Sequence, residues 1–349
     1  MSLPARMKVG MYYSNSDVRV EEQDVPAVGP GEILIKVLAS GICGSDLLEW
    51  YRIKTAPRVL GHELTGEVVA VGDGVEGLVP GDRVFTTHHV PCEECPACLS
   101  GHETACTTFQ TVNNFTPGGF AEYLKVGGRS VVTGTLKLPD GVSSEQGAFV
   151  EPLGTVVRGL RAAGFQPGQT ILVVGTGLAG LLWVKAARAA GAGNVLATDL
   201  SDPRLRKARE FGAHHAVNAR TDDLPAWVEQ VNGGRKADVV VVCAGALPAA
   251  EAALRAVGKG GTVLFFAVPD PGDLVPVDFI PIWRDDVTIR TCYGASPRDN
   301  REALELLRTG AVQVDDMVTH RFGIDGIGTG FATAARPDDC LKVIIEPHG

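Results

Sequence analysis

The sequence predicts an α/β protein made of a doubly wound parallel sheet and a second, β-rich domain. Three observations lead to this fold class: the length of the chain, a change of hydrophobic pattern after residue 167, and a glycine-rich turn. At 349 residues the chain is too long for one domain of about 100 to 200 residues, so two domains are expected. We place the first domain at residues 1–155 and 294–349, and the second at residues 156–293.

The first part of the chain, from about Val18 to Val126, contains short alternating runs that glycine and proline interrupt. Examples are Glu32–Leu38, Leu64–Gly72 and Asp82–Phe85. Such runs are typical of antiparallel strands joined by turns. The last apolar run, Leu341–Ile345, is expected to be a strand that returns to this domain.

Beyond Gln166–Gly168, continuous apolar runs alternate with helical stretches. The runs are Thr170–Val174, Asn194–Thr198, Asp238–Cys243, Thr262–Val268 and Val287–Thr291. Runs that are apolar on both faces suit buried parallel strands, and the stretches between them suit crossover helices. A further helix is expected at Asn300–Arg308.

The glycine turn lies between the first of these strands and an expected helix at Leu181–Ala190. Three glycines in the pattern G-x-G-x-x-G allow a tight turn and the close approach of a pyrophosphate, and the helix N-terminus supplies amide groups. The strand before the turn and the helix after it favour a dinucleotide site over a chance match. The residues assigned to the cofactor are Gly175, Gly177, Leu178, Ala179 and Gly180.

The second parallel strand ends at Asp199, about 20 residues after the glycines, where a carboxylate can bind the ribose hydroxyls. Because such a carboxylate repels a 2′-phosphate, we expect NAD rather than NADP. Two alternatives stay open. Asp199 could simply cap the following turn, and the nearby Arg204 could stack on adenine or bind a phosphate.

A run of four cysteines, Cys92-x2-Cys95-x2-Cys98-x7-Cys106, predicts a metal site. In a secreted protein such cysteines would suit disulfides, but in a reducing compartment the spacing favours thiolate ligands. Four thiolates leave no coordination position for a substrate, so this zinc would be structural and would fix a lobe at about residues 90–108.

Three other segments offer mixed ligands for a second zinc: Gly41–Asp46, Gly61–Glu63 and Val150–Gly154. A catalytic zinc takes about three protein ligands and keeps one position open for water or a substrate oxygen. The candidate ligands are Cys43, His62, Glu63 and Glu151, although Cys43 and His62 taken alone could be ordinary interior residues. We therefore expect two zinc ions per chain.

These motifs together resemble the zinc-containing medium-chain alcohol and polyol dehydrogenases, especially the sorbitol and threonine dehydrogenase branch. In that family the G-I-C-G-x-D and G-H-E turns hold the catalytic zinc, which implies this role for Cys43, His62 and Glu63. The V-E-P-L segment implies Glu151 as a ligand, and the choice between Glu63 and Glu151 stays open. The resemblance also implies a GroES-like catalytic domain and a Rossmann NAD-binding domain.

The resemblance implies reversible hydride transfer between NAD and a secondary alcohol or polyol, with Ser45 taking the first proton. It also implies a homo-oligomer, either a tetramer or a dimer. Two departures stand out. Leu48 occupies the position of a relay histidine, and Cys292–Ala295 lacks the arginine common in polyol dehydrogenases, which counts against sorbitol itself.

Two other classes of function remain as alternatives. A zinc hydrolase would use Glu63 as general base on a metal-bound water, but it would not need the glycine turn. A non-catalytic zinc protein of the same fold would not need the mixed ligand set.

The substrate is expected to be a small molecule. The net charge is −9 and the cations are scattered, which excludes a typical nucleic-acid protein, and no apolar run is long enough for a membrane span, so a cytoplasmic enzyme is expected. Candidate pocket residues, each also explicable by packing or surface position, are Trp50, Tyr51, Phe115, His88 and His89, the two histidines as replacements for the missing relay.

Overall fold

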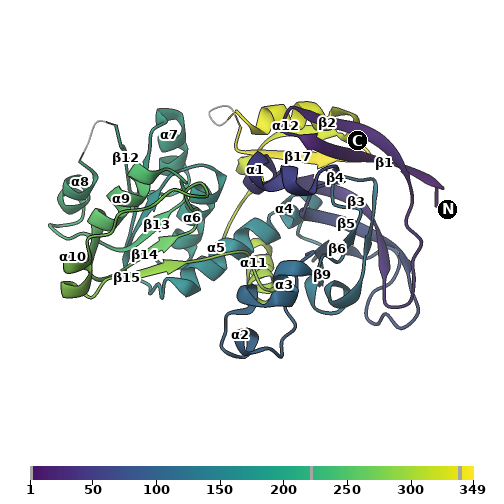
Figure 1. The fold of residues 1–349 in the computed structure, drawn as a ribbon, viewed down its shortest axis with the longest axis horizontal. Helices are drawn as coiled ribbons and strands as arrows, with labels where there is room; N and C mark the ends of the chain where they lie inside the picture. The colour runs from purple at the N-terminus through teal and green to yellow at the C-terminus, as the bar shows by residue number, and fades with distance from the viewer. Residues whose placement is uncertain (1–2, 221–222, 337–339) are drawn as a thin grey trace. The chain divides into compact units, whose positions relative to one another are not determined.

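The computed structural model describes residues 3–220, 223–336 and 340–349. The chain divides into two compact units, Met1–Gly154 with Ala295–Gly349 and Thr155–Gly294 (Figure 1). Within the described ranges, none of the helices has both the length and the apolar composition needed to cross a bilayer. The predicted α/β fold class is confirmed, because one unit is β-rich and the other contains a parallel sheet.

The first unit is built on two sheets. Its strands are β1 (Arg6–Ser14), β2 (Asp17–Asp24), β3 (Ile33–Gly41), β4 (Arg58–Val59), β5 (Glu63–Val71), β6 (Arg83–Thr86), β7 (Phe115–Thr116), β8 (Tyr123–Val126), β9 (Thr135–Lys137), β16 (Val318–Gly323) and β17 (Lys342–Glu346). The larger sheet has the order β16-β17-β3-β5-β6-β9, with β8 pairing β3 and β7, and the smaller has the order β2-β1-β4. Strand β17 pairs with β3, so the predicted return of the last strand to this domain is confirmed.

Short helices and turns connect these strands. The helices are α1 (Glu49–Arg52), α2 (Pro96–Leu99), α3 (Thr107–Thr111), α4 (Ser144–Ala148), α11 (Pro297–Arg308) and α12 (Ile327–Ala334). Single turns of 3₁₀ or π helix occupy Gly44–Leu47, Ile53–Thr55, Glu103–Ala105, Ser130–Gly134, Asp315–Met317 and Ile324–Gly326. Helix α5 (Val150–Ala162) begins in the first unit and continues into the second.

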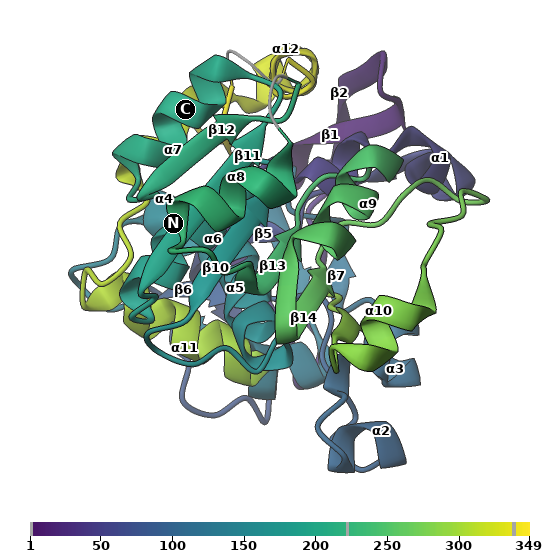
Figure 2. The same cartoon turned by 90° about the vertical axis from the view of Figure 1, so that its left-hand side faces the viewer.

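The second unit contains a six-stranded sheet whose neighbouring strands are all parallel. Its strands are β10 (Thr170–Val174), β11 (Asn194–Asp199), β12 (His215–Asn218), β13 (Ala237–Val242), β14 (Val257–Phe265) and β15 (Thr288–Thr291). Its helices are α6 (Leu178–Ala189), α7 (Asp202–Glu210), α8 (Leu224–Val231), α9 (Leu247–Ala256) and α10 (Phe279–Arg284). The order β12-β11-β10-β13-β14-β15 reverses direction at β10, and α8 and α9 pack together on one face (Figure 2).

All five predicted parallel strands are present; β10 has the predicted ends, and the other four have shifted ends. The largest shift is in β14, which begins at Val257 rather than Thr262, because Val257 already pairs with Ala237 before a bulge in the ladder. Helix α6 begins at Leu178, three residues before the expected start, because the backbone becomes helical directly after Gly177. The last three residues of the glycine turn therefore form the first turn of the helix.

Candidate active site

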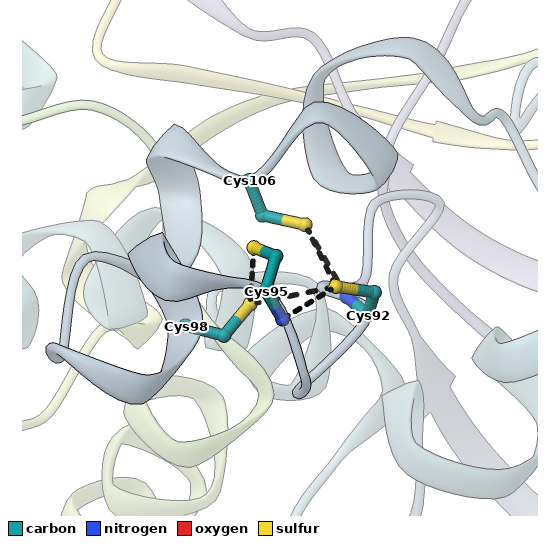
Figure 3. Close-up of side chains that lie close together, drawn as sticks. All are labelled: Cys92, Cys95, Cys98 and Cys106. Atoms are coloured by element: carbon teal, nitrogen blue, oxygen red, sulfur yellow. Dashed lines mark hydrogen bonds between the residues drawn. The ribbon is translucent and has the colours of Figure 1, made fainter.

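Four cysteine side chains of the loop around α2 point toward one another, as Figure 3 shows. Their sulfur atoms lie within 4.8 Å of one another. The Sγ–Sγ distances are 3.5 Å for Cys92 and Cys106, 3.5 Å for Cys95 and Cys98, and 3.9 Å for Cys92 and Cys98. Tetrahedral zinc with Zn–S bonds of about 2.3 Å requires sulfur atoms about 3.8 Å apart, so the four thiols fit a closed zinc site.

Backbone amides prepare this cluster for a cation. The Cys92 sulfur accepts a hydrogen bond of 3.3 Å from the Cys95 amide, and the Cys106 sulfur accepts one of 3.3 Å from the Cys92 amide. Amide donors from Glu94 and Cys95 lower the pKa of the Cys92 thiol, which favours the thiolate form that zinc requires. The arrangement of the four thiols is thus compatible with a metal ion bound by this lobe.

A second cluster of donors joins two strand ends of the first unit. The ligand atoms of Cys43, His62 and Glu63 lie within 4.8 Å of one another. Cys43 follows β3, and the other two residues lie at the start of β5. Gly61 makes this arrangement possible, because its φ is +97° and a Cβ there would lie 2.7 Å from the Phe120 amide nitrogen. Only glycine fits a turn that combines this dihedral with this close approach.

The buried carboxylate of Asp46 controls the electrostatics of this second cluster. It accepts a 3.1 Å hydrogen bond from the Cys43 amide and lies 3.6 Å from Nδ1 of His62. Burial alone would lower the pKa of His62, but the charges of Asp46 and Cys43 outweigh it and raise this pKa to about 10. The same negative field favours a divalent cation, and with Nδ1 facing Asp46, Nε2 is the nitrogen available as a ligand.

Glu63 is shared between this cluster and a buried lysine. The ammonium group of Lys342, on β17, donates to Oε2 of Glu63 and, at 3.1 Å, to the carbonyl oxygen of Ile42. The side chains of Lys342 and Glu63 are 0% and 1% exposed. Gly41 leaves the space for this pair, since a Cβ there would lie 2.4 Å from Glu63 Oε2. One oxygen of Glu63 is therefore held by a cation of the protein itself.

The structure brings together three of the four residues predicted to bind the catalytic zinc. Glu151, on α5, is not part of the group of donors that lie within 4.8 Å in the described chain. It is nevertheless close enough for its charge to interact with those of His62 and Glu63. Burial is the main cause that raises the pKa of Glu151 to about 7, with His62 opposing the shift and Glu63 adding to it.

Ser45, the residue expected to take the first proton, is held by an arginine that the sequence analysis missed. Arg52 donates to Ser45 Oγ at 2.9 Å, to the Ser45 carbonyl oxygen at 3.0 Å and to Asp46 Oδ1 at 3.1 Å. Leu48, which stands where the relay histidine is common, is 42% exposed. Of the missed residues, Lys342 had a visible signal, because it is the one charge in an otherwise apolar strand core.

A pocket opens beside His62 in the first unit. Its lining includes Arg52, Arg58, His88, Asn113 and Phe115. Of the predicted pocket aromatics, Phe115 lines this pocket, whereas Trp50 and Tyr51 are 41% and 45% exposed and do not contribute to it.

The two predicted histidines lie in a row beside the second cluster. The ring of His88 is centred 5.4 Å from that of His62 and 3.7 Å from that of His89. Burial is the main cause that lowers the pKa of both, that of His89 to about 4. Both imidazoles are thus neutral near pH 7.

The glycine turn has the geometry that a dinucleotide requires. Gly175 has a φ of +94°, and a Cβ on Gly180 would lie 1.9 Å from the Gly175 carbonyl oxygen. Gly177 caps α6, whose N-terminus carries Leu178 and Ala179. The absence of side chains at Gly175 and Gly180 is thus a steric requirement, whereas a Cβ on Gly177 would come no closer than 4.0 Å to another group, the Arg204 guanidinium. The turn leaves amide groups at a helix N-terminus for a pyrophosphate.

Asp199, at the end of β11, is fixed by backbone amides. One carboxylate oxygen accepts from the Thr176 amide at 2.6 Å, and the other accepts from Leu200 at 2.7 Å and Ser201 at 3.0 Å. Arg204 lies 4.0 Å from the same carboxylate. Asp199 therefore does cap the following turn, and it also joins this turn to the glycine turn.

Comparisons with known proteins agree with this architecture. Residues 29–140 match the family described as alcohol dehydrogenase GroES-like domain, and residues 179–309 match the zinc-binding dehydrogenase family. The sorbitol dehydrogenase of Bacillus subtilis is 32% identical over 99% of this chain and 99% of its own. The L-threonine 3-dehydrogenase of Pyrococcus horikoshii is 36% identical over 86% of this chain and 87% of its own.

Solved structures give the same result. A putative zinc-binding dehydrogenase from Sinorhizobium meliloti, bound to NADP, superposes with a TM-score of 0.89 at 30% identity, covering 99% of this chain and 100% of the other. Galactitol-1-phosphate dehydrogenase from Escherichia coli superposes with a TM-score of 0.88 at 28% identity, covering 98% and 100%. The chain therefore belongs to the zinc-binding medium-chain alcohol and polyol dehydrogenases, which are oxidoreductases that use zinc and a nicotinamide cofactor.

Proposed function

We propose that this enzyme catalyses reversible hydride transfer between NAD and a secondary alcohol or polyol, with a ketone as the product. The difference between the two donor clusters carries the proposal. Cys92, Cys95, Cys98 and Cys106 form a closed set of four thiols. Cys43, His62 and Glu63 form a mixed set of three, which leaves a coordination position for a substrate oxygen. One zinc would be structural and the other catalytic, with Glu151 as a further candidate ligand.

The residues of the chain would bind, orient and deprotonate the substrate. Zinc supplies Lewis-acid polarisation of the alcohol oxygen, and NAD accepts the hydride from the carbinol carbon. Ser45 Oγ takes the hydroxyl proton. Arg52 holds Ser45 Oγ in place at 2.9 Å. Because Ser45 is only half-buried, water can remove the proton without a relay histidine at position 48. Alcohol and NAD thus give ketone, NADH and one proton.

NAD is the proposed coenzyme because of Asp199. Its carboxylate is fixed by amide hydrogen bonds at the end of β11, where it would accept from ribose hydroxyls and repel a 2′-phosphate. The contacts of Gly175, Gly177, Leu178, Ala179 and Gly180 would be with the pyrophosphate. Arg204 would then serve the adenine, since its guanidinium lies beside the Asp199 carboxylate.

We also propose a homo-oligomer, a dimer or a tetramer, formed through the edge of the parallel sheet. All four residues of β15 are exposed, and in the described chain this strand pairs with β14 alone. Phe279, Ile280 and Trp283 on the neighbouring α10 are 69%, 62% and 78% exposed. An exposed edge strand beside exposed apolar side chains suits pairing with a second copy. A reducing, cytoplasmic compartment is proposed because all eight cysteines are free thiols.

The test is NADH formation with a panel of polyols and secondary alcohols, each with NAD and with NADP. We expect turnover with NAD, loss of turnover in Cys43→Ala, and about two zinc ions per wild-type chain. Ester or amide hydrolysis without NADH formation would favour the hydrolase alternative instead. The pairing of Glu63 with Lys342 counts against that alternative, because the ammonium group already occupies one of the carboxylate oxygens that a general base would use.

A further inference from the structure

The pocket beside His62 contains a cation, Arg58, that forms no ion pair of its own within the described chain, although the Asp46 carboxylate lines the same pocket. Arg52 and Arg58 both line it. Arg52 is paired with Asp46 at 3.1 Å, but the hydrogen bond recorded for the Arg58 side chain is a long one of 3.4 Å to the Thr55 hydroxyl. Asp46 also faces His62, so its single negative charge is shared among His62, Arg52 and Arg58. The two arginines together therefore carry more positive charge than Asp46 balances.

The surroundings of Arg58 make this imbalance costly. Burial and then the neighbouring charge of Arg52 lower the pKa of Arg58, and Tyr51 and Asp46 oppose this shift only in part. Burial and the Arg52 charge both destabilise the charged guanidinium, and both effects are relieved when an anion binds next to it. An arginine placed this way is typical of a site that recognises a carboxylate or a phosphate, since its planar fork matches either group.

Besides the two arginines, the pocket is lined by the Asp46 carboxylate, by His62 and by uncharged groups. Nδ1 of His88 is buried and lacks a hydrogen-bond partner among the described residues. Oδ1 of Asn113 accepts a 3.1 Å bond from the Phe115 amide, which leaves Nδ2 of Asn113 as a donor. The ring of Phe115 supplies an apolar wall. Donors around a small polar pocket with one apolar side suit an anionic head group attached to a carbon chain.

We propose that this pocket binds an anionic group of the substrate, a carboxylate or a phosphate monoester, and that Arg58 is the residue that selects it. The inference rests on the proposed dehydrogenase function, because the bound group would belong to the alcohol that is oxidised. Since the pocket shares His62 with the candidate catalytic cluster, an anion held there would keep a neighbouring hydroxyl carbon beside the zinc ligands.

The first measurement compares kcat/KM for matched neutral and anionic alcohols with the zinc-loaded enzyme and NAD. One pair is sorbitol and sorbitol 6-phosphate, and the other is 2-butanol and 3-hydroxybutyrate. We expect the anionic member of at least one pair to be preferred by about tenfold or more, as for the loss of a charged hydrogen bond. The phosphate and carboxylate pairs distinguish the two kinds of anion. If neither pair shows a preference for its anionic member, the proposal is wrong.

The second measurement repeats this comparison with Arg58→Met, Arg58→Lys and the control Lys54→Met. Lys54 is an exposed cation four residues away that does not line the pocket. Arg58→Met should reduce the preference for the anion by about tenfold, Arg58→Lys should reduce it less, and Lys54→Met should leave it unchanged. Should Arg58→Met instead raise the KM of NAD equally with both members of a pair, the arginine would serve the coenzyme, and the proposal would be wrong.

A binding measurement separates failure of this proposal from failure of the proposed function. Calorimetric titration of the zinc-loaded protein with inorganic phosphate and with acetate should detect binding to the wild type and to Lys54→Met, and weaker binding to Arg58→Met. If no alcohol is oxidised with either coenzyme, the proposed function fails, and this titration still decides whether the anion pocket exists. Binding that is absent, or equal in wild type and Arg58→Met, would refute the pocket.

Discussion

Replacing Lys342 with methionine would remove the cation from a fully buried ion pair and leave Glu63 without a counter-ion. The two side chains are 0% and 1% exposed, so water cannot compensate for the loss. Breaking such a pair from one side costs about 3 to 5 kcal/mol. The first unit holds roughly 200 residues, for which each kcal/mol corresponds to about 2 to 4 °C, so Tm should fall by about 6 to 20 °C.

Thermal and urea unfolding followed by circular dichroism would measure this effect. Lys8→Met is a matched control, because it removes the same charge from an exposed ion pair with Asp325, 2.8 Å long, and should change Tm little. Adding Glu63→Gln to Lys342→Met should recover part of the loss, since the unpaired carboxylate is then gone. The reasoning fails if Lys342→Met is no less stable than Lys8→Met, or if the double variant is as unstable as the single one.

The remaining predictions concern the two metal clusters, the glycine turn and a partly buried histidine. Cys43→Ala should abolish turnover and reduce the zinc content by one ion while keeping the wild-type circular dichroism spectrum. Cys98→Ala should instead lower Tm. A zinc content that Cys43→Ala leaves unchanged would contradict the two-site scheme. Gly180→Ala should weaken NAD binding by fluorescence titration and lower Tm, because its Cβ would lie 1.9 Å from the Gly175 carbonyl oxygen; a variant equal to the wild type would show that the turn can widen. His89 has a folded-state pKa of about 4, below its ordinary value, so its contribution to stability is present above pH 6.5 and is lost as the pH falls toward 4. Between pH 7 and pH 4, the free energy of unfolding of His89→Asn, measured in urea, should therefore fall by up to about 3 kcal/mol less than that of the wild type. If the two proteins lose stability in parallel as the pH falls, the imidazole of His89 is not held neutral in the folded protein.

The side-chain groups that the sequence anticipated, and that the structure brings together, depend on local spacing. The four cysteines of the lobe lie within fifteen positions, and the glycine turn spans six, so neighbouring residues alone determine which groups can meet. The same holds for the parallel strands, whose buried faces are visible as apolar runs. Their ends were less predictable, because pairing with a neighbouring strand, as at Val257 and Ala237, extends a strand beyond its apolar run.

The parts that the sequence could not predict depend on sheet register. Gly41 pairs with Glu63 across β3 and β5, and it also pairs with Ile344 on β17. This double pairing brings Lys342 to Glu63, although no local pattern links the two residues. Arg58 is a similar case, because the two-residue strand β4 is positioned through its pairing with β1. A charge inside an apolar strand signals a buried partner, but only the register identifies that partner.

The pairing of β17 with β3 also affects the order in which the two units can fold during translation. Lys342 follows Glu63 by 279 positions, so a nascent chain exposes the ligands of the mixed cluster long before their buried ammonium partner leaves the ribosome. The second unit is one continuous segment and can fold in the meantime, while the first unit waits for its final strand. Until then, the Glu63 carboxylate lacks the ammonium group that occupies one of its oxygens in the finished protein.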